Sequence, residues 1–128
     1  MDLRAARDRL AAQHPAGLHA HPRPPGTVGH LPCYVVQDPS EIDYHPTYGD
    51  RQNVTVAIRV IVARTADQDG TAELDDLVST LPAQLEAITP AGKWREVAIT
   101  GLTGGYRDFT EGGAVIGVSA DLTARITF

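Results

Sequence analysis

The stretch that decides the fold is Ala114–Phe128, AVIGVSADLTARITF, at the end of the chain. Its even-numbered positions are all apolar, whereas Ser119, Asp121, Thr123, Arg125 and Thr127 alternate with them. A period of two is the side-chain repeat of a β-strand, and a helix would not give it. The stretch therefore predicts a strand with one buried face.

This predicted strand is long for a chain of 128 residues. At about 3.3 Å per residue it would run roughly 50 Å, whereas a compact chain of this length has a radius of gyration of about 14 Å. We therefore expect it to bend, at Gly117, or to extend beyond its own domain. An overhanging strand or hairpin is a means of pairing with a neighbouring molecule.

The remaining elements follow from periodicity and from breaker residues. Val54–Val62 alternates like the terminal strand. Thr71 is the expected cap of a helix whose apolar stripe runs to Ile88. We expect Pro82 to break or kink this helix, by opening a second helix in its first turn. Further segments predict a helix at 2–13 and strands at 18–21, 31–37 and 96–102. The sequence predicts one α+β domain, residues 1–128, with a mainly antiparallel sheet, helices packed on one face and a long C-terminal β-hairpin.

Two segments are expected to be long loops with aromatic side chains, 38–53 and the glycine-rich 101–113. Aromatic residues and arginine are enriched at protein interfaces. We therefore assign partner contact as a hypothesis, against plain loop packing, to six residues: Ile42, Tyr44, Tyr48, Tyr106, Arg107 and Phe109.

Composition narrows the class of protein. A net charge of −5 without basic clusters argues against a nucleic-acid-binding protein. Apolar stretches are short and the first residues lack a signal-peptide core, so we expect folding in the cytoplasm and no membrane contact. Cys33 is the only cysteine, which excludes an intrachain disulfide and predicts a small buried apolar residue. Trp94 is expected to cap one end of the core.

Catalytic signatures are weak, and we expect no enzyme, no cofactor and no metal. Ser119 lies inside a strand and is expected on its solvent face, and Cys33 is too buried for a nucleophile. Asp75 and Asp76 are expected to be solvated on the polar face of a helix, and Glu41 and Asp43 are expected in a loop without a catalytic role. An alternative uses the histidine-rich front of the chain, where His19 and His21 would share one strand face, a spacing suited to a metal. Its other histidines are His14, His30 and His45.

The order of several short motifs resembles a known family. They are Leu-Arg-Ala-Ala at 3–6, Pro-Arg-Pro-Pro at 22–25, Pro-Ser-Glu-Ile-Asp-Tyr-His-Pro-Thr-Tyr-Gly at 39–49 and Arg-Thr-Ala-Asp at 64–67. A leucine-rich helical segment, a Gly-Tyr segment and the terminal alternating strand follow. Together these features are similar to the tail terminator, or minor tail, proteins of siphophages that infect actinobacteria.

The resemblance implies a structural virion protein at the head-proximal end of the tail. Such a protein forms a homo-oligomeric ring, usually a hexamer, that caps the tail tube, ends its polymerisation and joins it to the head-completion or connector protein, while DNA passes through without specific binding. We place the ring interface on 114–128 with the helix 71–88, and axial contacts on the two loops. The alternatives are a head-completion stopper, a tail tube subunit, an adaptor of a bacterial secretion tube, or a small ligand- or metal-binding domain.

Overall fold

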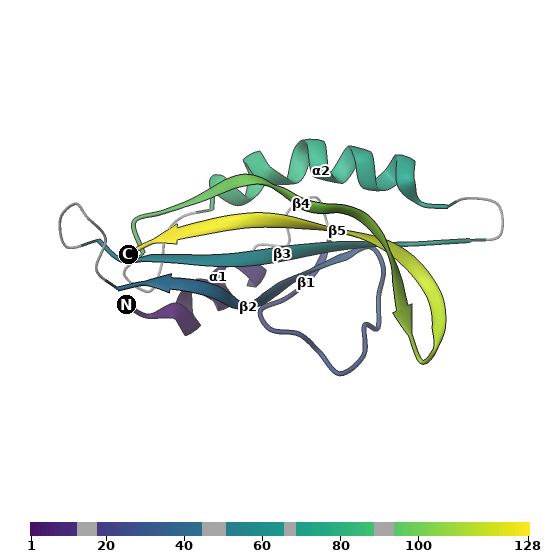
Figure 1. Ribbon diagram of the computed structural model, residues 1–128, viewed down its shortest axis with the longest axis horizontal. Helices are drawn as coiled ribbons and strands as arrows, with labels where there is room; N and C mark the ends of the chain where they lie inside the picture. The colour runs from purple at the N-terminus through teal and green to yellow at the C-terminus, as the bar shows by residue number, and fades with distance from the viewer. Residues whose placement is uncertain (13–17, 45–50, 66–68, 89–93) are drawn as a thin grey trace.

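The computed structural model describes residues 1–12, 18–44, 51–65, 69–88 and 94–128 (Figure 1). In this part of the chain two helices accompany five strands. The helices are α1 (Leu3–Ala12) and α2 (Thr71–Glu86). The strands are β1 (His19–His21), β2 (Cys33–Asp43), β3 (Asn53–Ala63), β4 (Glu96–Glu111) and β5 (Ala114–Thr127).

All five strands form a single mixed sheet in the order β1-β2-β3-β5-β4. β2 pairs antiparallel with β3, β3 with β5, and β5 with β4. The short β1 instead runs parallel to β2, through His19–Cys33 and His21–Val35. The predicted α+β class is confirmed, and the parallel β1 makes the sheet mixed.

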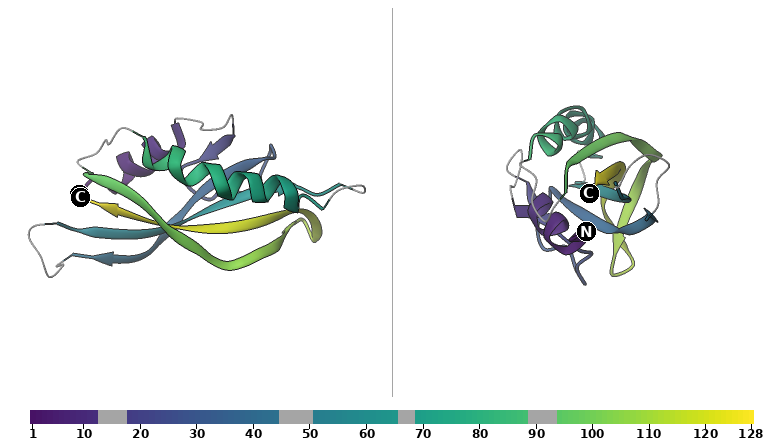
Figure 2. Two further views of the ribbon diagram at one scale, coloured as in Figure 1. Left: turned by 90° about the horizontal axis from the view of Figure 1, so that it is seen from above. Right: turned by 90° about the vertical axis from the view of Figure 1, so that its left-hand side faces the viewer.

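The core lies on one face of this sheet. The even positions of β3 and β5 from Val54 to Val62 and from Val118 to Ile126 are buried, as their alternation predicts. Side chains of both helices, among them Leu10 of α1 and Leu81 of α2, enter the same buried cluster. Figure 2 shows α2 running along the length of the sheet. A smaller cluster on the opposite face consists of Cys33, Val35 and Ile61.

Trp94 is 5% exposed and belongs to the main cluster, so its predicted place in the core is confirmed.

The predicted loop at 101–113 is wrong, because most of it is strand. β4 continues from Glu96 to Glu111, and only Gly112 and Gly113, both with positive φ, turn the chain into β5. Inside β4, Gly104 (φ 80°) and Gly105 (φ 68°) lie at a register shift between Thr103 and Arg107. Gly101 lies at a further register shift, after Ile99. The glycines that predicted a loop therefore lie at irregularities of a paired strand and in the turn that follows it.

The predicted loop at 38–53 also begins too early. β2 extends to Asp43 and is paired with β3, with register shifts on both sides of Pro39. Pro39 fits there because, among the described residues, no strand pairs with the outer side of β2 beyond Val35, and proline is tolerated at sheet edges and bulges.

The helical predictions need two corrections. α2 is continuous from Thr71 to Glu86 with Pro82 inside it, so the predicted break does not occur. Its cap is Gly70 (φ 84°), and Thr71 is the first helical residue. Asp69 accepts hydrogen bonds from the Thr71 amide and hydroxyl (3.0 and 2.8 Å), which lowers the pKa of that carboxyl.

β5 overhangs the strand beside it. The ladder with β3 ends at Ala63–Gly117, and Ala114–Ile116 lies beyond that last pair, where Val115 and Ala114 pair with β4. A side chain at Gly117 would place its Cβ 2.3 Å from the Val62 carbonyl oxygen, so only glycine fits at this point. Figure 1 shows the β4–β5 tip curving away from the sheet. We call residues 107–117 the arm.

Candidate functional site

The six predicted contact residues fall into two groups on different parts of the sheet. Ile42 is half-buried in β2 and packs against the main cluster, while Tyr44, just beyond β2, is 55% exposed. Tyr48 lies outside the described residues. Tyr106, Arg107 and Phe109 all belong to β4. In Figure 1 the ends of β2 and β4 point in opposite directions, so the structure does not bring the two groups together.

The β4 residues differ in what they contact. Tyr106 packs against the main cluster and its hydroxyl donates to Asp75 of α2 (2.6 Å), a bond that raises the pKa of Tyr106 to about 12. Phe109 turns to the opposite face and packs against the Cys33 cluster. Arg107 is exposed, and its Nε donates to the Gly104 carbonyl (3.3 Å). Two of the three therefore have a packing role, and Arg107 is the residue left to solvent.

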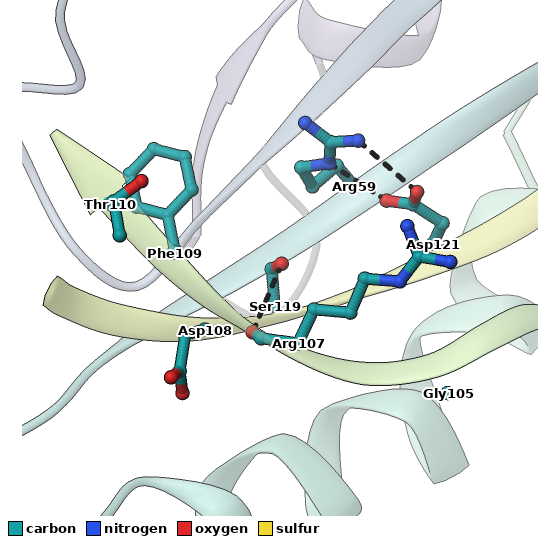
Figure 3. Close-up of a pocket in the computed structure, with 8 residues that line it drawn as sticks. All are labelled: Arg59, Gly105, Arg107, Asp108, Phe109, Thr110, Ser119 and Asp121. Carbon is teal, nitrogen blue, oxygen red and sulfur yellow. Dashed lines mark hydrogen bonds and ion pairs between the residues drawn. The ribbon is translucent and has the colours of Figure 1, made fainter.

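A pocket of about 220 Å³ lies on the sheet face opposite the main core, beside the arm (Figure 3). An ion pair that sequence analysis missed forms part of its wall: Arg59 contacts Asp121 through Nε (2.9 Å) and a second nitrogen (3.2 Å). This bond raises the pKa of Arg59. The lining residues are Arg59, Gly105, Arg107, Asp108, Phe109, Thr110, Ser119 and Asp121.

Ser119 in this pocket corrects one prediction. It is buried (7% exposed) rather than on the solvent face, because the arm covers it. Its hydroxyl donates a hydrogen bond to the Arg107 carbonyl oxygen at 3.5 Å.

A second pocket, of about 230 Å³, shares Arg59, Phe109 and Thr110 with the first. Residues Pro24–Gly26 and Val28 form its opposite wall, and the Val28 amide donates to the Glu111 carboxylate (2.9 Å). Cys33 belongs to the cluster on the same face; burial, with a smaller effect from Glu111, raises the pKa of its thiol to about 11. A thiol with so little thiolate at neutral pH is a poor nucleophile, as the sequence predicts for Cys33.

The histidines do not form a shared centre in the described part of the chain. The rings of His19 and His30 stack with centroids 4.5 Å apart, while His21 has a buried Nε2 without a hydrogen-bond partner. His14 and His45 lie outside the described residues. Among the residues described, no group of three histidine, cysteine, aspartate or glutamate side chains could hold a metal ion.

Two strands form the outer edges of the sheet within the described part of the chain. β5 is paired with β3 on one side and with β4 on the other, so β4 forms one edge of the sheet. The strand 114–128, predicted to form the ring interface, therefore lies largely inside the sheet. At the other edge β1 covers only Cys33–Val35 of β2, and Arg7 of α1 then donates to the Val36 carbonyl (3.3 Å) and to Asp38 (3.0 Å). Backbone groups at a sheet edge are a template for another strand.

An apolar notch of about 350 Å³ lies beside the β4 edge, between that strand and α2. Its wall includes Leu102, which is 40% exposed, and Gly101, which has no side chain to fill the space. The other lining residues are Val78, Pro82, Ile99, Thr100 and Leu122.

No protein-family model matches this chain, and a search of curated proteins found no match to its sequence. Within the described residues, neither helix is long and apolar enough to cross a membrane.

Proposed function

We propose that this protein is a structural, non-catalytic subunit of a tailed-bacteriophage virion, of the tail terminator class. In this proposal it forms a ring, a hexamer by the family resemblance, at the head-proximal end of the tail. The ring ends polymerisation of the tail tube and joins the tube to the head-completion or connector protein.

The observation that carries the proposal is the pair of open sheet edges. The edge at β2 and the edge at β4 are different surfaces at opposite sides of one sheet. A contact between two different surfaces of identical subunits is heterologous, and it generates a ring when the rotation between neighbours closes. The overhanging β4–β5 hairpin adds length to one of these edges.

The distribution of exposed aromatic and basic side chains supports a ring with two working faces. Tyr44 lies just beyond β2, and Arg107 lies on the arm. Strand ends that point in opposite directions would face opposite sides of a ring whose axis follows the strands (Figure 1). One group would then contact the tail tube and the other the head connector.

The charge of the chain supports a passive role toward DNA. The net charge is −5, and the exposed Arg107 stands next to Asp108, which pairs with Arg64 (2.9 Å). DNA passing through the ring would meet no continuous basic surface of the kind that phosphate binding needs.

The test is a capping assay with the tail tube protein of the same genome. Tube protein is allowed to polymerise with and without this chain, and tube lengths are measured by negative-stain electron microscopy. We expect shorter tubes of narrower length distribution, each with extra density at one end. Tubes of unchanged length without end density would overturn the terminator proposal.

The same assay separates the rival functions. Self-polymerisation of this chain into tubes would identify a tube subunit, and binding to the connector but not to the tube would identify a stopper. A strict monomer that ignores both, and whose His19–His21 region binds Zn²⁺ in calorimetry, would favour a small metal-binding domain.

A further inference from the structure

Parts of the two outer sheet edges share the same cross-sheet rows. Successive strand pairings connect residues of β2 through β3 and β5 to residues of β4 in the same cross-sheet row. The rows are Pro39–Val56–Ala124–Ile99, Glu41–Thr55–Arg125–Ala98, Ile42–Val54–Ile126–Val97 and Asp43–Asn53–Thr127–Glu96.

The two edge segments without a strand partner overlap only in part along the strands. On β2, β1 and then Arg7 occupy the edge as far as Asp38, and the outer side of 39–42 has no strand partner among the described residues. On β4, 96–103 precedes the Gly104–Gly105 bulge. This β4 segment continues beyond the Pro39–Ile99 row to Thr103, which shares its row with Val35, a residue that β1 covers. The two segments therefore share the rows from Ile42–Val97 to Pro39–Ile99.

Strand directions also allow the sheet to continue. Each step from β2 to β3, β5 and β4 is antiparallel, so β4 runs opposite to β2. A copy rotated about an axis along the strands would keep its β2 direction and would meet β4 as an antiparallel partner. No shift along the axis is needed for the rows that the two segments share.

We infer that a second copy of this chain adds its β2 segment 39–42 to the β4 segment 97–99. A rotation without rise closes into a ring rather than growing into a filament. This inference deepens the proposed function and rests on it for the existence of a ring.

Charges at the two segments are complementary in one row. Glu41 and Arg125 are exposed, share the sheet face opposite the main core, and make no ion pair with any described residue. In the extended sheet the copy's Glu41 lies opposite Ala98, and Arg125 can reach over that small side chain.

The apolar notch lies on the other face of the same edge. Its exposed Leu102 and its neighbours Ile99, Val78 and Pro82 border the β4 segment on the α2 side. In each copy α1 contacts β2, with Arg7 reaching Val36 and Asp38. Adding β2 of the copy would bring its α1 toward the notch. Backbone pairing beside an apolar pocket is the arrangement by which sheet edges capture strands.

Engineered disulfides test the pairing directly, because the buried Cys33 leaves a clean background. Glu41→Cys combined with Ala98→Cys places both thiols in one cross-strand pair between copies. Within one chain these positions are three strand spacings apart, about 14 Å, too far for a disulfide, which needs Cα atoms within about 7 Å. Mild oxidation should give a ladder of dimers and higher oligomers that ends at the ring.

The matched control is Glu41→Cys with Thr110→Cys, which moves the second thiol to the arm of the same strand. We expect at least a tenfold lower yield of cross-linked chains. The charge variants give an independent readout that needs no disulfide. Glu41→Arg and Arg125→Glu should each weaken association at least severalfold, and the double exchange should restore it.

The possible failures are distinguishable. A ring by light scattering that gives no 41–98 cross-link and no charge rescue would overturn this pairing while leaving the proposed function intact. A monomer at all concentrations, even in the presence of the tube protein, would overturn both.

Discussion

The two ends of β5 carry the same sequence alternation and have different surroundings. From Val118 to Ile126 the even positions are buried between the sheet and the helices. From Ala114 to Ile116 the same pattern continues, yet Ala114 is exposed and Ile116 is only half-buried. Alternation predicts that a strand forms, whereas burial depends on whether another element covers it. The uncovered end of β5 belongs to the arm.

The largest expected difference between the two ends is in stability. Ile126→Ala removes a fully buried side chain and should lower the free energy of unfolding by about 2–5 kcal/mol. Ile116→Ala in the same strand is the matched control, and we expect a loss of less than about 1 kcal/mol. Urea denaturation of both variants measures the difference. Equal losses of unfolding free energy would contradict the difference in burial between the two ends.

The junction between the two ends should be intolerant of any side chain. Gly117→Ala would bring a Cβ within 2.3 Å of the Val62 backbone oxygen, which the ladder holds in place. We expect a loss of about 1–3 kcal/mol, as for other overpacked sites. The control is Gly101→Ala, where nothing lies within 4 Å and the change should stay within about 0.5 kcal/mol. An unchanged free energy of unfolding for Gly117→Ala in urea denaturation would mean that β3 and β5 separate at this point.

Phe109 is the main apolar contact of the arm with the second face of the sheet, and the Cys33 thiol reports on it. In the folded protein a thiol reagent at pH 8 should label Cys33 very slowly, because the side chain is buried and its pKa is about 11. Phe109→Ala should raise the labelling rate several-fold by opening the cluster. Labelling followed by mass spectrometry measures both rates. Unchanged labelling would show that the arm does not protect this face.

The smallest expected effect concerns Tyr106, where the bulge joins the arm to α2. Tyr106→Phe removes the hydrogen bond to Asp75 and should cost no more than about 1 kcal/mol at pH 7. The folded pKa of about 12 lies above the usual value of about 10, so this contribution is complete below pH 10 and is lost as pH rises toward 12. Urea denaturation should show a smaller gap between the two proteins at pH 11 than at pH 7.

Sequence patterns located the regular elements well where periodicity is strong. β3 extends the predicted strand Val54–Val62 by one residue at each end. β5 matches the predicted strand 114–128 within one residue, and the predicted helix beginning at Thr71 is present. The partner strands were harder to predict. β4 contains three glycines, Gly101, Gly104 and Gly105, and residue propensities predict a loop there, whereas pairing with β5 holds the segment as a strand.

The site residues depend on tertiary contacts that a single sequence does not encode locally. Arg59 and Asp121 are far apart in the chain and meet because their strands pair in register. Ser119 has the solvent-face position in the alternation but is covered by Arg107 and the arm. The rows that the two edges share likewise emerge only from the strand order, since β4 follows β5 in the sheet but precedes it in the chain.

The most direct test of the proposed ring is the mass of the purified protein, measured by multi-angle light scattering across a wide concentration range. The measurement is made on the protein alone and with the tail tube protein. The proposal predicts a species of about six times the 13.7 kDa chain, alone or once the tube is present. A 13.7 kDa species under every condition would contradict it.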